Sequence, residues 1–224
     1  MSTIHDVVFL LDCDNTLLDN DHVQQDISTY LTATYGGQFR DRYWQVFETL
    51  RDELGYADYL GVVQQCRLAA PNDPRLLQLA GYFLDYPFAT RLYPGALDVI
   101  AHLRRWGPTV ILTDGDAVYQ PRKVQRSGLW QAAEGRVLIY VHKEKMLDDI
   151  QQHYPARHYV VVDDKLRILT ATKAGLGDRL TTIFPRQGRY ALDPRECAGL
   201  PPPDITIEGI DALLNYEFSA LQAL

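Results

Sequence analysis

The stretch FLLDCDNTLLDN, residues 9–20, decides how this chain is interpreted. It continues an apolar run, residues 7–11, that consists of Val, Phe and Leu. Such a short run is typical of a strand that is buried on both faces of a parallel sheet. The run leads directly into Asp12, and Asp14 follows after one intervening residue. Two carboxylates this close repel each other unless a positive group lies nearby, so the end of this strand is a candidate functional site.

Most of the remaining chain alternates between short apolar runs and helical periodicity. After the first strand, strands are predicted at residues 109–112, 137–141, 159–162, 180–184 and 205–207. Helices are predicted at residues 96–106, 119–127, 144–153 and 165–174, and a last helix closes the chain. Strands that alternate with helices imply right-handed crossovers. The predicted fold class is therefore α/β, with a doubly wound, Rossmann-like parallel sheet.

One long segment interrupts this alternation. Residues 21–86 show helical patterns and no convincing strand, and Pro87 breaks the chain after them. We therefore expect an all-α cap that is inserted after the first strand. The expected domains are a catalytic core, residues 1–17 and 88–224, and a helical cap, residues 18–87.

Composition and charge favour a globular protein and do not exclude a small anionic ligand. The 224-residue chain is 46% hydrophobic and 23% charged, and no apolar run is long enough to span a bilayer. Its net charge of −7 disfavours nucleic acid and anionic membranes as partners. The opening residues MSTIHD lack a secretory signal pattern, and the three cysteines have no paired spacing. We expect a cytoplasmic protein that is a monomer or a homodimer.

Polar residues follow the predicted strands at the points where they end. In an open parallel sheet, the carboxyl ends of the strands meet at one edge, and ligands bind there. Four predicted strands end in such residues: Asp12 and Asp14, Thr113 and Asp114, His142 and Lys143, and Asp163 and Asp164. We expect these side chains to gather at one site.

Several carboxylates at one edge of a sheet require a cation. Mg²⁺ fits this need because it binds few protein carboxylates and keeps waters and substrate phosphate oxygens as its other ligands. Lys143 and Thr113 add a positive charge and a hydroxyl for phosphate oxygens. A carboxylate nucleophile, a metal ion and a lysine together indicate phosphoryl transfer. The expected ligand is a small phosphorylated metabolite.

These motifs resemble those of the haloacid dehalogenase-like (HAD) superfamily, which consists mostly of phosphatases. Its first motif, an apolar strand followed by DxDxT, corresponds to residues 8–16. Its second motif, an apolar strand that ends in Ser or Thr, corresponds to residues 110–113. Its fourth motif, an apolar strand that ends in paired Asp, corresponds to residues 160–164. The motifs follow the family's order over the whole chain, so the resemblance implies the family's core with an inserted cap.

The resemblance also implies a role for each acidic residue. Asp12 would attack phosphorus and form an aspartyl-phosphate, and Asp14 would protonate the leaving oxygen and then activate water. The Asp12 carboxylate, the backbone carbonyl of Asp14 and Asp163 would hold Mg²⁺. Asp164 would bind the ion through water, or it would orient Lys143.

The third motif, in which a Lys is often followed by Pro, has no proline here. In the family's arrangement, Thr113 and a lysine would bind the phosphoryl oxygens. We select Lys143 because it follows a predicted strand, and Lys145 and Lys123 remain alternatives.

Asp14 favours phosphate chemistry within this family. Dehalogenases of the family lack this second acid, since their leaving group needs no proton. The preferred function is therefore a Mg²⁺-dependent phosphatase that acts on a small phosphomonoester. A phosphomutase that uses Asp12 and Asp14 in the same way is one alternative. A member that binds a phosphorylated ligand without turnover is another.

Ordinary structural roles compete with functional ones at several residues. Asp164 could cap the helix that begins near Lys165, and Lys143 could be a solvated lysine at a helix start. Arg186 and Arg189 could reach an anionic substrate, but a solvated loop is the preferred interpretation of both.

Overall fold

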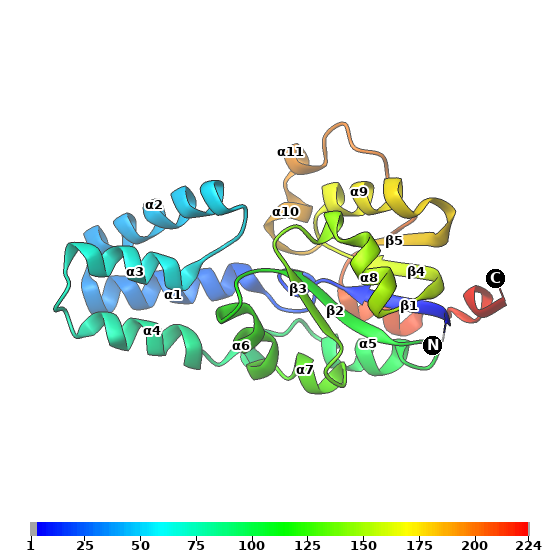
Figure 1. Cartoon of the computed structure of the whole chain (residues 1–224), viewed down its shortest axis with the longest axis horizontal. Coiled ribbons are helices and arrows are strands. Elements are labelled where there is room, and N and C mark those ends of the chain that lie inside the picture. Colours follow the sequence, from blue (N-terminus) through cyan, green and yellow to red (C-terminus); the bar gives the residue numbers. More distant parts are fainter. Residues whose placement is uncertain (1–3, 224) are drawn as a thin grey trace.

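The computed structural model describes residues 4–223, and its core is a six-stranded parallel sheet (Figure 1). The strands are β1 (His5–Leu11), β2 (Thr109–Asp114), β3 (Val137–Tyr140), β4 (Ala156–Val162), β5 (Leu180–Pro185) and β6 (Ile205–Ile207). Their order in the sheet is β3-β2-β1-β4-β5-β6, and each neighbouring pair is parallel. The predicted doubly wound α/β core is confirmed. The outermost residues of the predicted core domain, 1–3 and 224, lie outside the described residues.

The central position of β1 explains its unbroken apolar sequence. Leu11 is aligned with Ile111 of β2 on one side and with Val162 of β4 on the other. Along β1 the side chains alternate between two buried clusters, with Phe9 in one and Leu10 in the other. Since both faces of this strand are covered, both sets of side chains must be apolar.

Helices cover both faces of the sheet, as right-handed crossovers require. The face of Phe9 is packed by α5 (Ala96–Leu103), α6 (Tyr119–Arg126) and α7 (Leu129–Ala132). The face of Leu10 is packed by α8 (Leu147–His153), α9 (Leu166–Leu176), α10 (Gly188–Leu192) and α11 (Pro194–Cys197). This layering leaves the carboxyl ends of the strands free to form a site.

Four further helices lie beside the sheet core and cover neither of its faces (Figure 1). They are α1 (Asn20–Tyr35), α2 (Gly37–Leu54), α3 (Tyr59–Ala69) and α4 (Arg75–Asp85), and we call them the cap segment. Their interior combines aliphatic side chains with a group of aromatic ones, Tyr43, Phe47, Tyr59 and Phe83. An all-α segment between β1 and β2 is what the sequence predicts. The domain boundaries at residues 18 and 87 stay a prediction.

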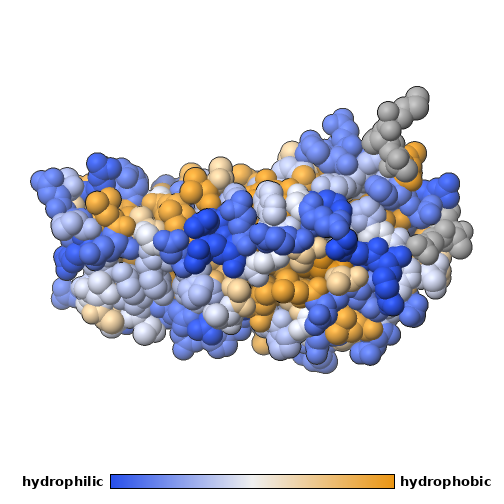
Figure 2. Space-filling view, turned by 90° about the horizontal axis from the view of Figure 1, so that it is seen from below, coloured by the Kyte–Doolittle hydropathy of each residue, from blue (hydrophilic) through white to orange (hydrophobic). Residues whose placement is uncertain are grey.

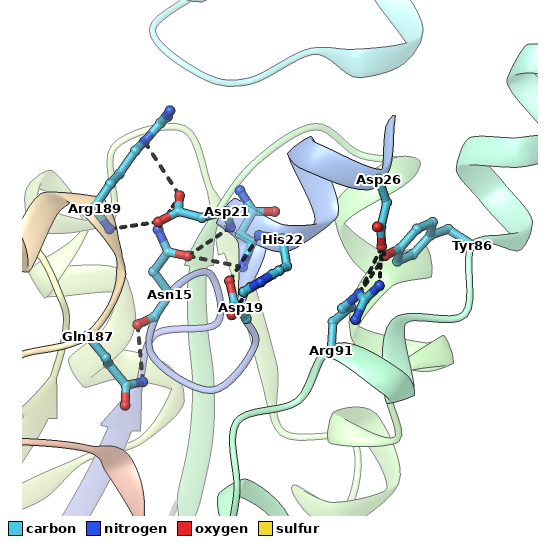
Figure 3. Close-up of polar contacts among 10 residues, drawn as sticks. Asn15, Asp19, Asp21, His22, Asp26, Tyr86, Arg91, Gln187 and Arg189 are labelled. Atoms are coloured by element: carbon cyan, nitrogen blue, oxygen red, sulfur yellow. Dashed lines mark hydrogen bonds and ion pairs between the residues drawn. The ribbon is translucent and has the colours of Figure 1, made fainter. Parts of the chain in front are cut away.

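Two connectors join the cap segment to the core, and they run side by side. Leu18 of the first connector forms an antiparallel bridge with Leu92 of the second. Arg91 in the second connector donates from Nε to the carboxylate of Asp26 on α1, at 2.8 Å. The hydroxyl of Tyr86 donates to the same carboxylate (Figure 3). These contacts fasten the beginning of the cap segment to its end.

The prediction of one last helix is wrong. The chain closes with two 3₁₀ helices, η4 (Ile210–Asn215) and η5 (Ser219–Ala223). Ile210 and Leu213 are the buried residues of η4, and a spacing of three matches the three residues per turn of a 3₁₀ helix. Phe218 follows and packs edge-on against Phe9 of β1, with ring centres 5.1 Å apart. The C-terminal tail is therefore packed against the core through separate apolar residues and not through the continuous apolar face of one helix.

The surface is mixed in character. Figure 2 shows a face on which hydrophobic residues gather over the core, beside bands of hydrophilic residues. Leu97 of α5 and Leu214 of η4 are large apolar residues that stay partly exposed. Within residues 4–223, no helix is long and apolar enough to cross a membrane. The oligomeric state stays a prediction.

Candidate active site

The residues that follow the strands meet at one edge of the sheet. Asp12 follows β1, Thr113 lies near the end of β2, and Asp163 and Asp164 follow β4, which is the neighbour of β1. The predicted helix at residues 144–153 is divided into a 3₁₀ turn, η2 (Lys143–Lys145), and α8. This turn follows β3 and carries Lys143 to the same edge.

Lys143 lies among buried carboxylates. Its Nζ forms ion pairs with Asp12 Oδ1 and, at 2.7 Å, with Asp163 Oδ2, and it donates to the carbonyl of Leu112 at 3.2 Å. Only 4% of its side chain is exposed. Burial acts to lower the pKa of Lys143, but Asp12 and Asp163 raise it well above its ordinary value. Lys143 is thus a fixed buried cation and not a solvated lysine.

Asp164 completes this group without a protein partner for its carboxylate. Its backbone N–H donates to Thr16 Oγ1 at 3.1 Å, whereas both of its carboxylate oxygens are buried and accept no hydrogen bond from described residues. Burial is the main cause that raises the pKa of Asp164 well above its ordinary value. Asp163, not Asp164, accepts from the N–H of Lys165 at 2.8 Å before α9. The alternative role of Asp164 as a helix cap therefore lacks its hydrogen bond.

We call Asp12, Lys143, Asp163 and Asp164 the carboxylate cluster. Oxygens of its three aspartates lie within 4.8 Å of one another, and all three residues are buried. Burial raises the pKa of Asp12 to about 6 despite the nearby Lys143. Lys143 and the nearby Lys165 supply only two positive charges for three carboxylates, and Asp12 Oδ2 also lacks a hydrogen-bond partner among the described residues. Unpartnered hard oxygens in a buried acidic cluster fit a divalent cation such as Mg²⁺.

The carboxylate of Asp14 has different partners from those of the carboxylate cluster. Lys123 Nζ on α6 binds Asp14 Oδ1 at 2.7 Å, and Gln120 Nε2 donates to Asp14 Oδ2 at 3.1 Å. We call these three residues the Asp14 group. Both carboxylate oxygens of Asp14 thus have donors, and its side chain is not part of the metal-binding set. Coordination through the backbone carbonyl of Asp14 stays a prediction.

Lys123 connects the Asp14 group to the cap segment. Its side chain is 1% exposed, and its Nζ also binds Asn20 Oδ1 of α1 at 3.1 Å. The ammonium group lies 5.9 Å from the ring centre of Tyr59, on α3, and 5.3 Å from that of Tyr119. Burial acts to lower the pKa of Lys123, but Asp14 and Tyr59 raise it. A buried lysine with a carboxylate partner and aromatic walls stays charged.

Thr113 contacts the Asp14 group through Gln120. Its side chain is buried at the end of β2, and its Oγ1 accepts a hydrogen bond from Gln120 Nε2 at 2.9 Å. The close approach of Gln120 depends on Gly115, where a Cβ would lie 2.6 Å from the Gln120 Cβ. Gly115, which follows the second motif, is therefore required because a larger residue would collide with Gln120.

The three candidate lysines occupy different places. Lys143 enters the carboxylate cluster, Lys123 pairs with Asp14, and Lys145 is exposed. Both burial and distance therefore favour Lys143 for contact with a group that is bound at Asp12. The same geometry assigns a different partner to Lys123.

A pocket of about 320 Å³ lies between the cap segment and the strand ends. The cap segment contributes Arg51, Tyr56 and Tyr59 to its lining. Asp14 and Lys165 line it from the core. The pocket therefore places Asp14 in contact with whatever enters between cap and core.

Cap and core also meet at Gly55, the residue that ends α2. Its φ of +81° lies in the left-handed region, and a Cβ there would lie 2.9 Å from the ring of His142. Glycine is needed here for both the turn and the contact.

Several residues of the site have no motif that predicts them. Gln120 lies three positions before Lys123 on one face of α6, and only this spacing hints that the two act together. Arg51 and Arg167 lie on helices whose amphipathic patterns explain them as ordinary surface residues. Their common position on the pocket depends on how the cap segment packs, which no local pattern encodes.

Comparisons with known proteins place this geometry in a family. No protein-family model and no curated protein sequence matches the chain. The crystal structure of a haloacid dehalogenase-like hydrolase from Burkholderia xenovorans LB400 is 59% identical and has a TM-score of 0.91. The match covers 98% of this chain and 99% of that one.

More distant solved structures share the fold. The HAD-hydrolase YfnB from Bacillus subtilis, which was crystallised with magnesium, has a TM-score of 0.62 at 16% identity, over 95% of this chain and 98% of that one. The L-2-haloacid dehalogenase PA0810 has a TM-score of 0.64 at 16% identity, over 95% and 99% of the two chains. At this level of identity the likeness concerns the fold alone. The extensive match to the Burkholderia protein shows that the chain belongs to the haloacid dehalogenase-like hydrolases.

Proposed function

We propose that this hydrolase is a Mg²⁺-dependent phosphatase that acts on a small phosphomonoester through a phosphorylated Asp12. One observation carries the proposal most directly. Asp14 lines the pocket between cap and core, while Asp12 lies two residues away in the buried carboxylate cluster. An acid that faces the ligand beside a buried nucleophile provides what the departure of an alkoxide requires.

The first step uses Asp12 and Asp14 together. A carboxylate oxygen of Asp12 attacks phosphorus, and the bond between phosphorus and the ester oxygen breaks. Asp14 gives a proton to that oxygen, so the product leaves as a neutral alcohol. Lys123 and Gln120 bind the carboxylate that remains on Asp14, which favours the transfer.

The second step reverses the role of Asp14. Its carboxylate takes a proton from a water molecule, and the water oxygen attacks phosphorus. The bond between phosphorus and Asp12 breaks, which releases inorganic phosphate and restores the carboxylate. Lys143, fixed against Asp12, and the hydroxyl of Thr113 supply donors for phosphoryl oxygens in both steps.

The cation is assigned to the carboxylate cluster. Asp12, Asp163 and Asp164 would hold it, and when bound it supplies positive charge to the carboxylates and to the phosphoryl oxygens. In the chain itself, Lys143 and Lys165 offset part of the negative charge of the three aspartates.

A dehalogenase is the second candidate, because proteins of that activity share the fold. A halide leaves as a stable anion and needs no proton. The Asp14 group would then have no chemical task, although Lys123 and Gln120 hold both of its carboxylate oxygens. The presence of this complete group favours the phosphatase.

The test compares both reactions in one preparation. We expect the wild type to hydrolyse p-nitrophenyl phosphate with Mg²⁺ and not with EDTA, and to release no chloride from L-2-chloropropionate. Asp12→Asn removes the nucleophile with little change of shape, and the loss should be about 10⁴-fold or more. Chloride release without phosphatase activity would overturn the proposal in favour of dehalogenation. Phosphatase activity that persists in Asp12→Asn would place the nucleophile elsewhere.

A further inference from the structure

We propose that the substrate carries a second anionic group, a carboxylate or another phosphate, which binds Arg51, Arg167 and Arg189 in the pocket between cap and core. This inference rests on the proposed phosphatase function and specifies the class of ester. It concerns the part of the substrate that does not react.

The charge of the pocket lining differs from that of the whole protein. The chain has a net charge of −7, yet the lining contains four cationic side chains, Arg51, Lys165, Arg167 and Arg189. Asp14 and Asp114 are the acidic residues of the lining within the described part of the chain. Both already have partners in the protein, since Asp14 pairs with Lys123 and Asp114 accepts from the N–H of Lys143 at 2.8 Å.

Lys165 belongs to the reacting end of the pocket. Burial acts to lower its pKa, but Asp164, Asp12 and Asp163 raise it, and its ammonium group lies 5.0 Å from the ring centre of Tyr190. The three arginines are not needed there, because Lys143 and Lys165 already face the carboxylate cluster. Arg51 pairs with Glu48 and Arg189 with Asp21, but both pairs are partly exposed, so these guanidinium groups can still bind a different group of the ligand.

Arg167 is the clearest candidate for a ligand contact. It lies in the first turn of α9 and is exposed, and its guanidinium has no ion pair or hydrogen bond within residues 4–223. Arg51, at the end of α2, has a single ion pair with Glu48 at 2.6 Å, and both partners are partly exposed. A surface pair of this kind contributes little and can be exchanged for a ligand anion.

Arg189 is held in place by the cap segment. Its backbone N–H donates to Asp21 Oδ2 at 2.7 Å, and its guanidinium donates to Gln24 Oε1 at 3.2 Å. Asp21 also accepts from Asn15 Nδ2, so the arginine is fastened to the loop that follows β1 (Figure 3). Its side chain is still 45% exposed, which leaves guanidinium donors for a ligand.

The size of the pocket limits the ligand. A volume of about 320 Å³ is at the lower end of the range for small-molecule sites, about 300–1,000 Å³. Two anionic groups on a short carbon skeleton fit this space. Arginine binds carboxylates and phosphates with paired N–H donors, so both kinds of second group suit the same three side chains.

Three phosphonates of similar length test the proposal by calorimetry in the presence of Mg²⁺. Propylphosphonate has one anionic group, 3-phosphonopropionate adds a carboxylate, and ethane-1,2-diphosphonate adds a second phosphonate. We expect at least one of the doubly anionic compounds to bind about tenfold more tightly than propylphosphonate. The better of the two identifies the second group as a carboxylate or a phosphate.

Variants tie this preference to the pocket. Arg167→Gln and the double variant Arg51→Gln/Arg167→Gln should progressively remove the preference. Arg157→Gln is the matched control, because Arg157 is an exposed arginine at the opposite end of β4, where it pairs with Asp6. That variant should keep the full preference.

The outcomes separate the two proposals. Equal binding of all three phosphonates, binding of none, or a preference that survives in the double variant would overturn this inference. Such a result leaves the phosphatase proposal standing if p-nitrophenyl phosphate is still hydrolysed through Asp12. A clear preference without any Asp12-dependent hydrolysis would instead contradict the proposed function.

Discussion

The two acidic motif residues, Asp12 and Asp14, have opposite surroundings. In the carboxylate cluster, Lys143 pairs with two of the three buried aspartates, and oxygens of Asp12 and Asp164 accept no hydrogen bond from described residues. In the Asp14 group, one carboxylate has two donors from α6. The first arrangement is incomplete without a further cation, and the second is complete in the protein alone. Two acids of one short motif are therefore prepared for different tasks.

This contrast makes the two buried lysines separable by experiment. Lys143 acts on charge at the nucleophile and the phosphoryl group, whereas Lys123 acts on the acid that serves the leaving oxygen. Changes at the carboxylate cluster should affect every substrate and the response to metal. Changes at the Asp14 group should depend on the leaving group.

Of the two buried lysines, Lys143 is expected to have the larger effect. Lys143→Met removes the cation that contacts Asp12 and Asp163, and turnover of p-nitrophenyl phosphate should fall about 10²–10³-fold. The measurement is steady-state kinetics at saturating Mg²⁺, with circular dichroism to verify folding. A folded variant that keeps a third of the wild-type rate would contradict the role given to Lys143.

A smaller and selective effect is expected at Lys123. Lys123→Met leaves Asp14 without its ammonium partner, so turnover of an alkyl phosphate should fall about 10²-fold. Hydrolysis of p-nitrophenyl phosphate should change only a few-fold, since nitrophenolate leaves without a proton. The ratio of the two rates is the readout, because general destabilisation would lower both rates equally. An unchanged ratio would contradict the separate role given to the Asp14 group at the leaving oxygen.

The metal response should be affected at Asp164 and not at Lys123. Asp164→Asn keeps the shape of the side chain and removes a carboxylate that accepts no hydrogen bond from described residues. The Mg²⁺ concentration for half-maximal turnover should rise about 10–100-fold. Lys123→Met is the matched control and should keep the wild-type Mg²⁺ requirement. Equal requirements in wild type and Asp164→Asn would remove Asp164 from the metal site.

The smallest effect concerns stability without metal. Burial raises the pKa of Asp12 to about 6 in the folded protein, whereas an unfolded chain has the ordinary value near 3.8. The folded state therefore binds this proton more tightly, and the destabilising contribution of Asp12 shrinks as the pH falls from 7 toward 4. In EDTA, wild type should gain about 1 kcal/mol relative to Asp12→Asn between pH 7 and pH 5. Thermal melting of both proteins at the two pH values measures this difference, and parallel pH profiles would contradict it.

The fold could be predicted from the sequence because its signals are local. Apolar runs such as residues 7–11 mark strands, and a long helical stretch marks the insertion between β1 and β2. The tail was harder to predict, since η4 buries only Ile210 and Leu213, and a spacing of three also fits an α-helix.

The site could be predicted only where residues follow strands. Asp12, Thr113, Lys143, Asp163 and Asp164 could be predicted as site residues from their positions at strand ends. The topology of a parallel sheet brings such positions to one edge. The partners of Asp14 could not be predicted in this way. Gln120 and Lys123 reach it from a helix more than a hundred residues away in sequence, and Tyr59 reaches Lys123 from the cap segment.

A direct search for phosphorylated Asp12 tests the central claim. In Asp14→Asn, p-nitrophenyl phosphate can still transfer its phosphoryl group, but the water that completes the cycle lacks its base. Acid quenching of this variant with substrate and Mg²⁺, followed by proteolysis and mass spectrometry, should show a phosphoryl group on the peptide that contains Asp12. Wild type that turns over the same ester, together with an unmodified Asp12 peptide in quenched Asp14→Asn, would contradict the account.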